Sequence, residues 1–228
     1  MSARAQTVMA RVRHSDEGSG SLADVDHLLY ATTDLQRGMD EIEALLGVRP
    51  VQGGRHPQYG THNALLSIGP GMYLEVIARD PELASPERGP FVDIPAKGAS
   101  RLLTWVLRTT DIQESSAAAR DAGIGLGAVV SGSRTNPDGS ELRWQVTDPY
   151  ATPMGGAVPF LISWGNTPHP SAVAPSGGRL VELLIEHPDA DRVRDAFSVL
   201  GANIPVINHD EFRICANIES KNGLVTLR

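Results

Sequence analysis

Tryptophan and arginine residues in the middle of the chain have types that could form a binding pocket. The three tryptophans of the sequence are Trp105, Trp144 and Trp164, and Arg134 and Arg143 lie among them. Aromatic walls with a few converging polar groups are typical of a site for a flat or hydrophobic small molecule, whose carboxylate or phosphate an arginine can hold. These five residues are therefore candidate substrate-binding residues.

Both residue types also have structural interpretations, which the sequence leaves open. A tryptophan on a strand often belongs to the hydrophobic core. Arg134 begins a run in which Pro137, Asp138 and Gly139 have the turn chemistry of a simple hairpin.

Charge and missing motifs exclude several other classes of function. The 228 residues carry 20 Lys and Arg against 27 Asp and Glu, a net charge of −7 without a basic block, so nucleic acid is not an expected partner. Gly123, Gly125 and Gly127 follow a helical segment instead of opening one, which argues against a dinucleotide-binding loop. Cys215 is the single cysteine, so a reducing compartment is favoured. No apolar stretch is long enough for a membrane span or a secretory signal, and we expect a cytoplasmic protein with no membrane partner.

The elements that would position these residues begin with a βαβββ pattern. A strand-like run at 25–31 precedes apolar residues at helical spacing over 35–46, with Asp34 as N-cap and Gly47 as the stop. Gly53-Gly54 is predicted to be a turn. Three short strands complete the unit, at 48–52, 63–68 and 72–78.

The same order of elements recurs twice, which indicates an internal repeat. The second copy has a strand at 103–109, a helix over 111–122 and strands at 127–131, 142–146 and 158–164. The third and weaker copy covers 180–227. The predicted parts are a flexible tail (1–22), a first βαβββ module (23–80), a linker (81–100), a second βαβββ module (101–165), a Pro- and Gly-rich linker (166–178) and a C-terminal βαβββ-like unit (179–228).

A single βαβββ unit leaves one face of a small sheet exposed. Two copies are therefore expected to pair into one curved sheet around a shared cavity. The predicted fold class is α+β, with the third unit appended to the pair. That third unit could also bury a face against a second copy of the chain and make a homodimer.

Two stretches of the sequence resemble the glyoxalase-like branch of the vicinal oxygen chelate superfamily. The first includes Asp-His-Leu-Leu-Tyr at 26–30, Gly-Thr-His-Asn-Ala-Leu-Leu at 60–66 and Tyr-Leu-Glu-Val-Ile at 73–77; the second includes Leu-Arg-Trp at 142–144, Pro-Phe-Leu-Ile at 159–162 and Trp-Gly-Asn-Thr-Pro-His-Pro at 164–170. The resemblance implies the paired βαβββ fold and a small-molecule ligand. It does not select a reaction, because the superfamily includes glyoxalases, epimerases, extradiol dioxygenases, thiol transferases and metal-free binding proteins.

The resemblance also implies metal-ligand positions on the first and last strands of each module. In the first module these positions hold His27 and Glu75, which suit a divalent ion such as iron, manganese or zinc. In the second module the same alignment puts Trp105 and Ile162 there, and neither side chain can bind a metal.

His62 is a candidate third ligand. Strand alternation puts His62 on one face with Ala64 and Leu66, and if that face points inward, His27, His62 and Glu75 form a two-histidine-one-carboxylate metal site. Two alternatives stay open. Without a metal, His27 and Glu75 could act as an acid/base pair, or they could be a buried, purely structural couple.

These observations lead to two functional hypotheses. The first is a glyoxalase-like enzyme with His27 and Glu75 as catalytic residues. It would act on a small oxygen-rich or aromatic metabolite by isomerase, lyase or oxygenase chemistry, with a divalent metal assisting. The second is a non-catalytic protein that binds or sequesters a small molecule in an aromatic-lined cavity.

Overall fold

The computed structural model describes residues 22, 24–84, 86, 98–135 and 141–228. The predicted tail over 1–21, most of the first linker and the predicted Pro137-Asp138-Gly139 turn lie outside the described residues. In the described part of the chain, no helix has the length and apolar character needed to cross a membrane.

The first module has the βαβββ order that the sequence predicts. Its helix begins where the Asp34 side chain accepts a hydrogen bond from the Arg37 amide and ends at Gly47, which has a φ of 78°. One correction concerns Gly53-Gly54, which lies inside a strand and not in a turn. The elements are β1 (Val25–Ala31), α1 (Leu35–Leu46), β2 (Val51–His56), β3 (Thr61–Gly69) and β4 (Met72–Arg79).

The second module repeats this order, with a short 3₁₀ turn before its last strand. Asp111 caps its helix by accepting hydrogen bonds from the amides of Gln113 and Glu114. The elements are β5 (Arg101–Arg108), α2 (Ile112–Asp121), β6 (Val129–Thr135), β7 (Glu141–Thr147), η1 (Pro153–Gly156) and β8 (Phe160–Ser163).

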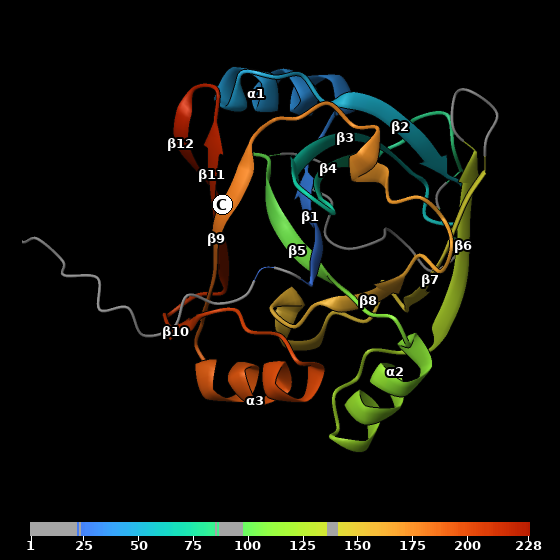
Figure 1. Cartoon of the computed structure of the whole chain (residues 1–228), viewed down its shortest axis with the longest axis vertical. Helices are drawn as coiled ribbons and strands as arrows, with labels where there is room; N and C mark the ends of the chain where they lie inside the picture. The colour runs from blue at the N-terminus through green and yellow to red at the C-terminus, as the bar shows by residue number, and fades with distance from the viewer. Residues whose placement is uncertain (1–21, 23, 85, 87–97, 136–140) are drawn as a thin grey trace, which may run out of the picture.

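The two modules share one eight-stranded sheet, in the order β2-β3-β4-β1-β5-β8-β7-β6. β1 and β5 join the modules as an antiparallel pair, and each pairs in parallel with the last strand of its own module. The sheet curves so far that its strands surround the centre of the molecule (Figure 1). The predicted paired modules and α+β fold are confirmed.

Both faces of the sheet are buried, and each face packs into its own hydrophobic cluster. Leu28, Leu74 and Trp105 belong to a large outer cluster that includes residues of α1 and of the C-terminal unit. Leu29 and Phe160 belong to a smaller inner cluster on the concave face. Alternation along each strand therefore divides its residues between an outer core and an inner cavity.

The C-terminal unit also has the predicted βαβββ order, but its sheet differs from those of the modules. Its strand order is β10-β9-β11-β12, with β9 between a parallel and an antiparallel neighbour. In the modules, the first strand instead pairs with the last. The elements are β9 (Arg179–His187), α3 (Ala190–Leu200), β10 (Val206–Asn208), β11 (Arg213–Ser220) and β12 (Gly223–Leu227), and η2 (Pro170–Ala172) lies in the connector before them.

The C-terminal unit is attached to the outer face of the curved sheet. Trp105 of β5 is fully buried there, with its ring centroid 5.4 Å from that of Phe197 on α3. Its indole N–H donates to the Ala157 carbonyl at 3.0 Å. The Asn222 side-chain amide donates to the carbonyl oxygens of Ala44 and Leu45 at the end of α1, which otherwise lack helical partners.

The contact between Trp105 and Phe197 generates a stability prediction. Phe197→Ala should lower the free energy of unfolding by about 3–5 kcal/mol because it leaves a cavity against Trp105. Leu224→Ala, at a position that is 66% exposed, is the control and should change the stability by less than about 0.5 kcal/mol. Urea denaturation of both variants measures the difference, and equal losses would contradict this account of the attachment.

Candidate functional site

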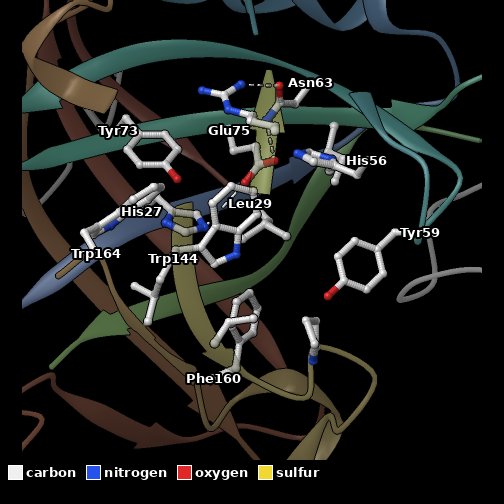
Figure 2. Close-up of a pocket in the computed structure, with 15 residues that line it drawn as sticks. His27, Leu29, His56, Tyr59, Asn63, Tyr73, Glu75, Trp144, Phe160 and Trp164 are labelled. Atoms are coloured by element: carbon white, nitrogen blue, oxygen red, sulfur yellow. Dashed lines mark hydrogen bonds and ion pairs between the residues drawn. The ribbon is translucent and has the colours of Figure 1, made fainter. Parts of the chain in front are cut away.

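A cavity lies on the concave side of the eight-stranded sheet, and both modules contribute to its walls (Figure 2). Its polar and titratable lining residues are His27, His56, Asn63, Glu75 and Arg134. Its aromatic lining residues are Tyr59, Tyr73, Trp144, Phe160 and Trp164. The cavity volume is about 70 Å³, which is room for on the order of five water molecules. It therefore suits a compact molecule, or the compact end of a larger one.

His27 is held by its neighbour Asp26 through an irregularity in β1. The register between β1 and β5 shifts between Val25 and His27, so Asp26 is an extra residue on β1. Consecutive strand residues normally point to opposite faces, yet His27 Nδ1 lies 2.7 Å from Asp26 Oδ1. With its proton on Nδ1, the imidazole donates to Asp26 and presents its other nitrogen, Nε2, away from that carboxylate.

Asp26 is completely buried and accepts two further hydrogen bonds, both at Oδ2. The Trp164 indole N–H donates at 3.0 Å and His169 Nε2 donates at 3.2 Å. His169 can donate through Nε2 because its Nδ1 accepts from the Ser171 amide. Burial alone would raise the pKa of Asp26, but the hydrogen bonds from His169 and His27 outweigh it and hold the pKa well below its ordinary value. Asp26 is therefore ionised at neutral pH.

Glu75 lies on the other side of His27. The distance between His27 Nε2 and Glu75 Oε2 is 3.4 Å, and the Asn63 side-chain amide donates to Glu75 Oε1 at 2.7 Å. The imidazole is thus clamped between two carboxylates at the cavity wall.

Two aromatic rings fix the plane of the His27 imidazole. Tyr73 stacks on it, with ring centroids 4.5 Å apart and an interplanar angle of 16°. Phe160 meets it edge-on at 6.3 Å. Burial, followed by the nearby charges of Glu75 and Asp26, raises the pKa of the Tyr73 phenol well above its ordinary value. Tyr73 therefore keeps its proton and remains a hydrogen-bond donor beside the cavity.

His56 is a further titratable group in the wall. Its Nδ1 lies 3.1 Å from the Thr61 hydroxyl oxygen. Burial lowers the pKa of His56 below its ordinary value, against an opposing effect from Glu75. The residue is therefore neutral at physiological pH.

Three of the predicted substrate-binding residues line the cavity. Trp144 and Trp164 lie with ring centroids 5.7 Å apart. Gly132, opposite Trp144 on β6, provides space for that ring, because a Cβ there would lie 2.4 Å from it. Arg134 reaches the cavity from β6 and donates to Asn63 Oδ1 at 3.2 Å.

The other predictions need correction. Trp105 faces the outer core, and the Arg143 side chain is 74% exposed and pairs with Glu141. His62 does lie on one strand face with Ala64 and Leu66, but that face points to the outer core, so the triad with His27 and Glu75 does not form. His62 Nδ1 instead lies 3.8 Å from Asp80 Oδ2.

The counterparts of His27 and Glu75 in the second module also differ from the alignment. His27 lies seven residues before the cap Asp34, and Thr104, not Trp105, lies seven before the cap Asp111. By strand pairing, the counterpart of Glu75 is Phe160 and not Ile162. The Thr104 hydroxyl donates to the Gly156 carbonyl. The second module therefore still offers no metal ligand.

The donor set does not fit a divalent ion held by the protein alone. His27 and Glu75 supply two donor atoms, whereas protein sites for zinc and similar ions use three or four. Among the described residues, no group of three or more histidine, cysteine, aspartate and glutamate side chains is arranged to hold a metal. Asn63, which is close enough to contribute, uses its amide nitrogen on Glu75 and its oxygen on Arg134.

Sequence reasoning missed several residues of the site. Asp26 is missed because the alternation of side chains along a strand puts it on the face opposite His27, and no sequence signal predicts the β-bulge. Asn63 and Tyr73 lie on the same strand faces as Glu75, so the correct inward register of β3 and β4 would have identified both.

A family model described as a glyoxalase-like domain matches residues 25–201. A hypothetical protein from Staphylococcus aureus is 17% identical, with a TM-score of 0.58 over 89% of this chain and 83% of that chain. A methylmalonyl-CoA epimerase from Streptomyces coelicolor is 20% identical, with a TM-score of 0.42 over 66% of this chain and 100% of that chain. The corresponding epimerase from Mycobacterium tuberculosis is 19% identical, with a TM-score of 0.41 over 66% and 92%. At 17% identity, the likeness to the Staphylococcus aureus protein concerns the fold alone. No curated protein matches the chain.

The burial of Asp26 generates a pH-dependent stability prediction. Asp26→Asn should lower the free energy of unfolding at neutral pH by about 3–5 kcal/mol, because the variant cannot accept three hydrogen bonds as a carboxylate. The pKa of Asp26 is lowered by folding, so ionised Asp26 stabilises the protein above the unfolded pKa of about 3.9, and this contribution is lost as the pH falls toward the folded-state pKa. The difference between wild type and variant should shrink over that range.

Urea denaturation at a series of pH values measures this difference. Asp210→Asn, at an exposed position, is the matched control and should track the wild type at every pH. A wild-type advantage over Asp26→Asn that stays constant into the acid range would contradict the assignment of Asp26 as an ionised, buried acceptor.

Proposed function

The chain belongs to the glyoxalase-like branch of the vicinal oxygen chelate superfamily, and from the geometry of its cavity we propose that it is an enzyme that moves a proton at a carbon next to a carbonyl group. The proposed substrate is a small organic molecule, and the reaction class is isomerase or lyase. The proposal needs no bound metal.

One observation carries the proposal: the His27 imidazole is clamped between Asp26 and Glu75 at the wall of the cavity. A histidine whose Nδ1–H is held by an ionised carboxylate has a defined tautomer and a basic Nε2, as a general base requires. Glu75, 3.4 Å from that nitrogen, can accept or return the proton.

The proposed step removes a proton from the substrate carbon and leaves the substrate as an enolate. His27 Nε2 takes the proton from the carbon, the C–H electron pair forms the enolate double bond, and the carbonyl π electrons move to oxygen. The Tyr73 hydroxyl, which points toward the cavity beside His27 (Figure 2), would donate a hydrogen bond to that oxygen. Return of the proton to another position completes an isomerisation, and loss of a leaving group from the neighbouring carbon completes a lyase reaction.

A second candidate function is favoured by the other half of the cavity. Trp144 and Trp164 lie side by side and, with Phe160 and Ile162, make the second module's wall largely apolar. A protein that binds an aromatic molecule without changing it would need only this wall. Tryptophan fluorescence quenching by a ligand that is recovered unaltered, together with no proton exchange, would support the binder over the enzyme.

Proton exchange tests the enzymatic proposal directly. In D₂O, the wild-type protein should accelerate deuterium incorporation next to the carbonyl of at least one of three probes, namely 2-oxo-4-phenylbutyrate, 4-phenylbutan-2-one and hydroxyacetone. Loss of a general base costs about 10²–10⁴-fold, so His27→Asn should slow the exchange by that factor. NMR of the probe measures the rate.

Arg143→Gln is the control for this experiment, because its side chain is exposed outside the cavity. It should exchange the probe as fast as the wild type. Wild-type rates equal to those of buffer for all three probes, or a folded His27→Asn variant with undiminished activity, would refute the proton-transfer proposal.

The donor set also predicts how the enzyme responds to chelators. Because no group of three or more histidine, cysteine, aspartate and glutamate side chains among the described residues is arranged to hold a metal, dialysis against a chelator should leave the exchange rate unchanged. Adding zinc or manganese should not raise it. A rate that falls on chelation and returns with one of these metals would instead show that a metal takes part.

A further inference from the structure

Arg134 is a buried cation for which the described residues offer no counter-charge. The residue is 8% exposed and lines the cavity. Its one hydrogen bond to a described side chain runs from Nη1 to Asn63 Oδ1. No described carboxylate lies within ion-pair distance of it, whereas a guanidinium has five N–H donors. A charge buried in this way is costly unless something else in the cavity pairs with it.

Asn63 keeps the cation apart from the nearest carboxylate. Its amide nitrogen donates to Glu75 Oε1, which turns its oxygen toward Arg134 and the Gly54 amide. The Asn63 side chain therefore lies between Arg134 and Glu75. Glu75 remains available to His27, and no described side chain occupies the remaining donors of Arg134.

Two consecutive glycines make room for the Arg134 side chain. A Cβ at Gly53 would lie 2.5 Å from Arg134 Nη1 and 2.2 Å from Asn63 Oδ1. A Cβ at Gly54 would lie 2.9 Å from Arg134 Cδ. All three distances are shorter than real Cβ contacts allow, so any other residue at either position would displace the Arg134 side chain. The strand β2 is thus shaped to admit this one side chain into the cavity.

We infer that Arg134, held by Asn63 and seated against Gly53-Gly54, binds a carboxylate of the substrate. The planar guanidinium matches a carboxylate in a bidentate arrangement. The substrate class is then a small carboxylic acid that carries a carbonyl group, with an apolar or aromatic substituent against Trp144 and Trp164. The carbonyl part of this assignment rests on the proposed function, whereas the carboxylate part does not.

Binding of non-reacting probes tests the carboxylate subsite separately from catalysis. Phenylacetate and its neutral analogue phenylacetamide differ in charge but hardly in shape. In the wild type, calorimetry should show phenylacetate binding about 10- to 100-fold more tightly than phenylacetamide, the usual effect of charge-assisted hydrogen bonds. Arg134→Gln should abolish that preference, and Arg134→Lys, which keeps the charge but not the fork, should retain part of it.

Arg143→Gln is again the control and should keep the full preference. His27→Asn should also keep it, so a failure of the catalytic proposal would not be mistaken for a failure of this one. Equal binding of phenylacetate and phenylacetamide to the wild type would overturn the inference, and this outcome needs no variant to fold. Tighter binding of benzylphosphonate than of phenylacetate would overturn the assignment to a carboxylate in favour of a phosphate-like group.

Discussion

The site depends on one buried carboxylate. Asp26 is an extra residue in β1, and from there it accepts hydrogen bonds from His27 on the same strand, Trp164 at the end of β8 and His169 in the connector that follows. One side chain thus ties the first module, the second module and the connector together. Its ionised state holds the His27 proton on Nδ1, so that Nε2, the nitrogen that faces Glu75, is left to act as the base.

The two modules contribute different chemistry to one cavity. The first supplies the titratable groups on β1, β2 and β4, and the second supplies mainly rings and aliphatic side chains on β7 and β8. At the positions equivalent to His27 and Glu75, the second module has Thr104 and Phe160. The Thr104 hydroxyl donates to the Gly156 carbonyl and the Phe160 ring packs against His27, so the second module does not repeat the acid/base pair. Arg134 is the exception. It is a charged side chain of the second module, and it donates to Asn63 of the first module.

The sequence predicted most of the fold because its signals are local. Asp34 and Asp111 mark the helix starts, and the repeat predicted two modules that share a sheet. The sequence-based prediction failed where three-dimensional packing determines which way a residue faces. The face of His62 depends on which side of β3 meets α1, the contact of Asp26 with His27 depends on a register shift, and Gly53-Gly54 lies in a strand because a side chain from β6 needs the space. The third unit keeps the βαβββ order yet pairs its strands differently, since the order of elements alone does not determine which strands pair.

The eight-stranded sheet has a seam between its edge strands β2 and β6. Every other joint in the sheet is a ladder of peptide hydrogen bonds, which almost any sequence can make. At the seam the described contact is made by side chains. Arg134 of β6 donates to Asn63 of β3 and lies over Gly53 and Gly54 of β2. The closure of the sheet between β2 and β6 therefore depends on side-chain contacts and not on backbone hydrogen bonds.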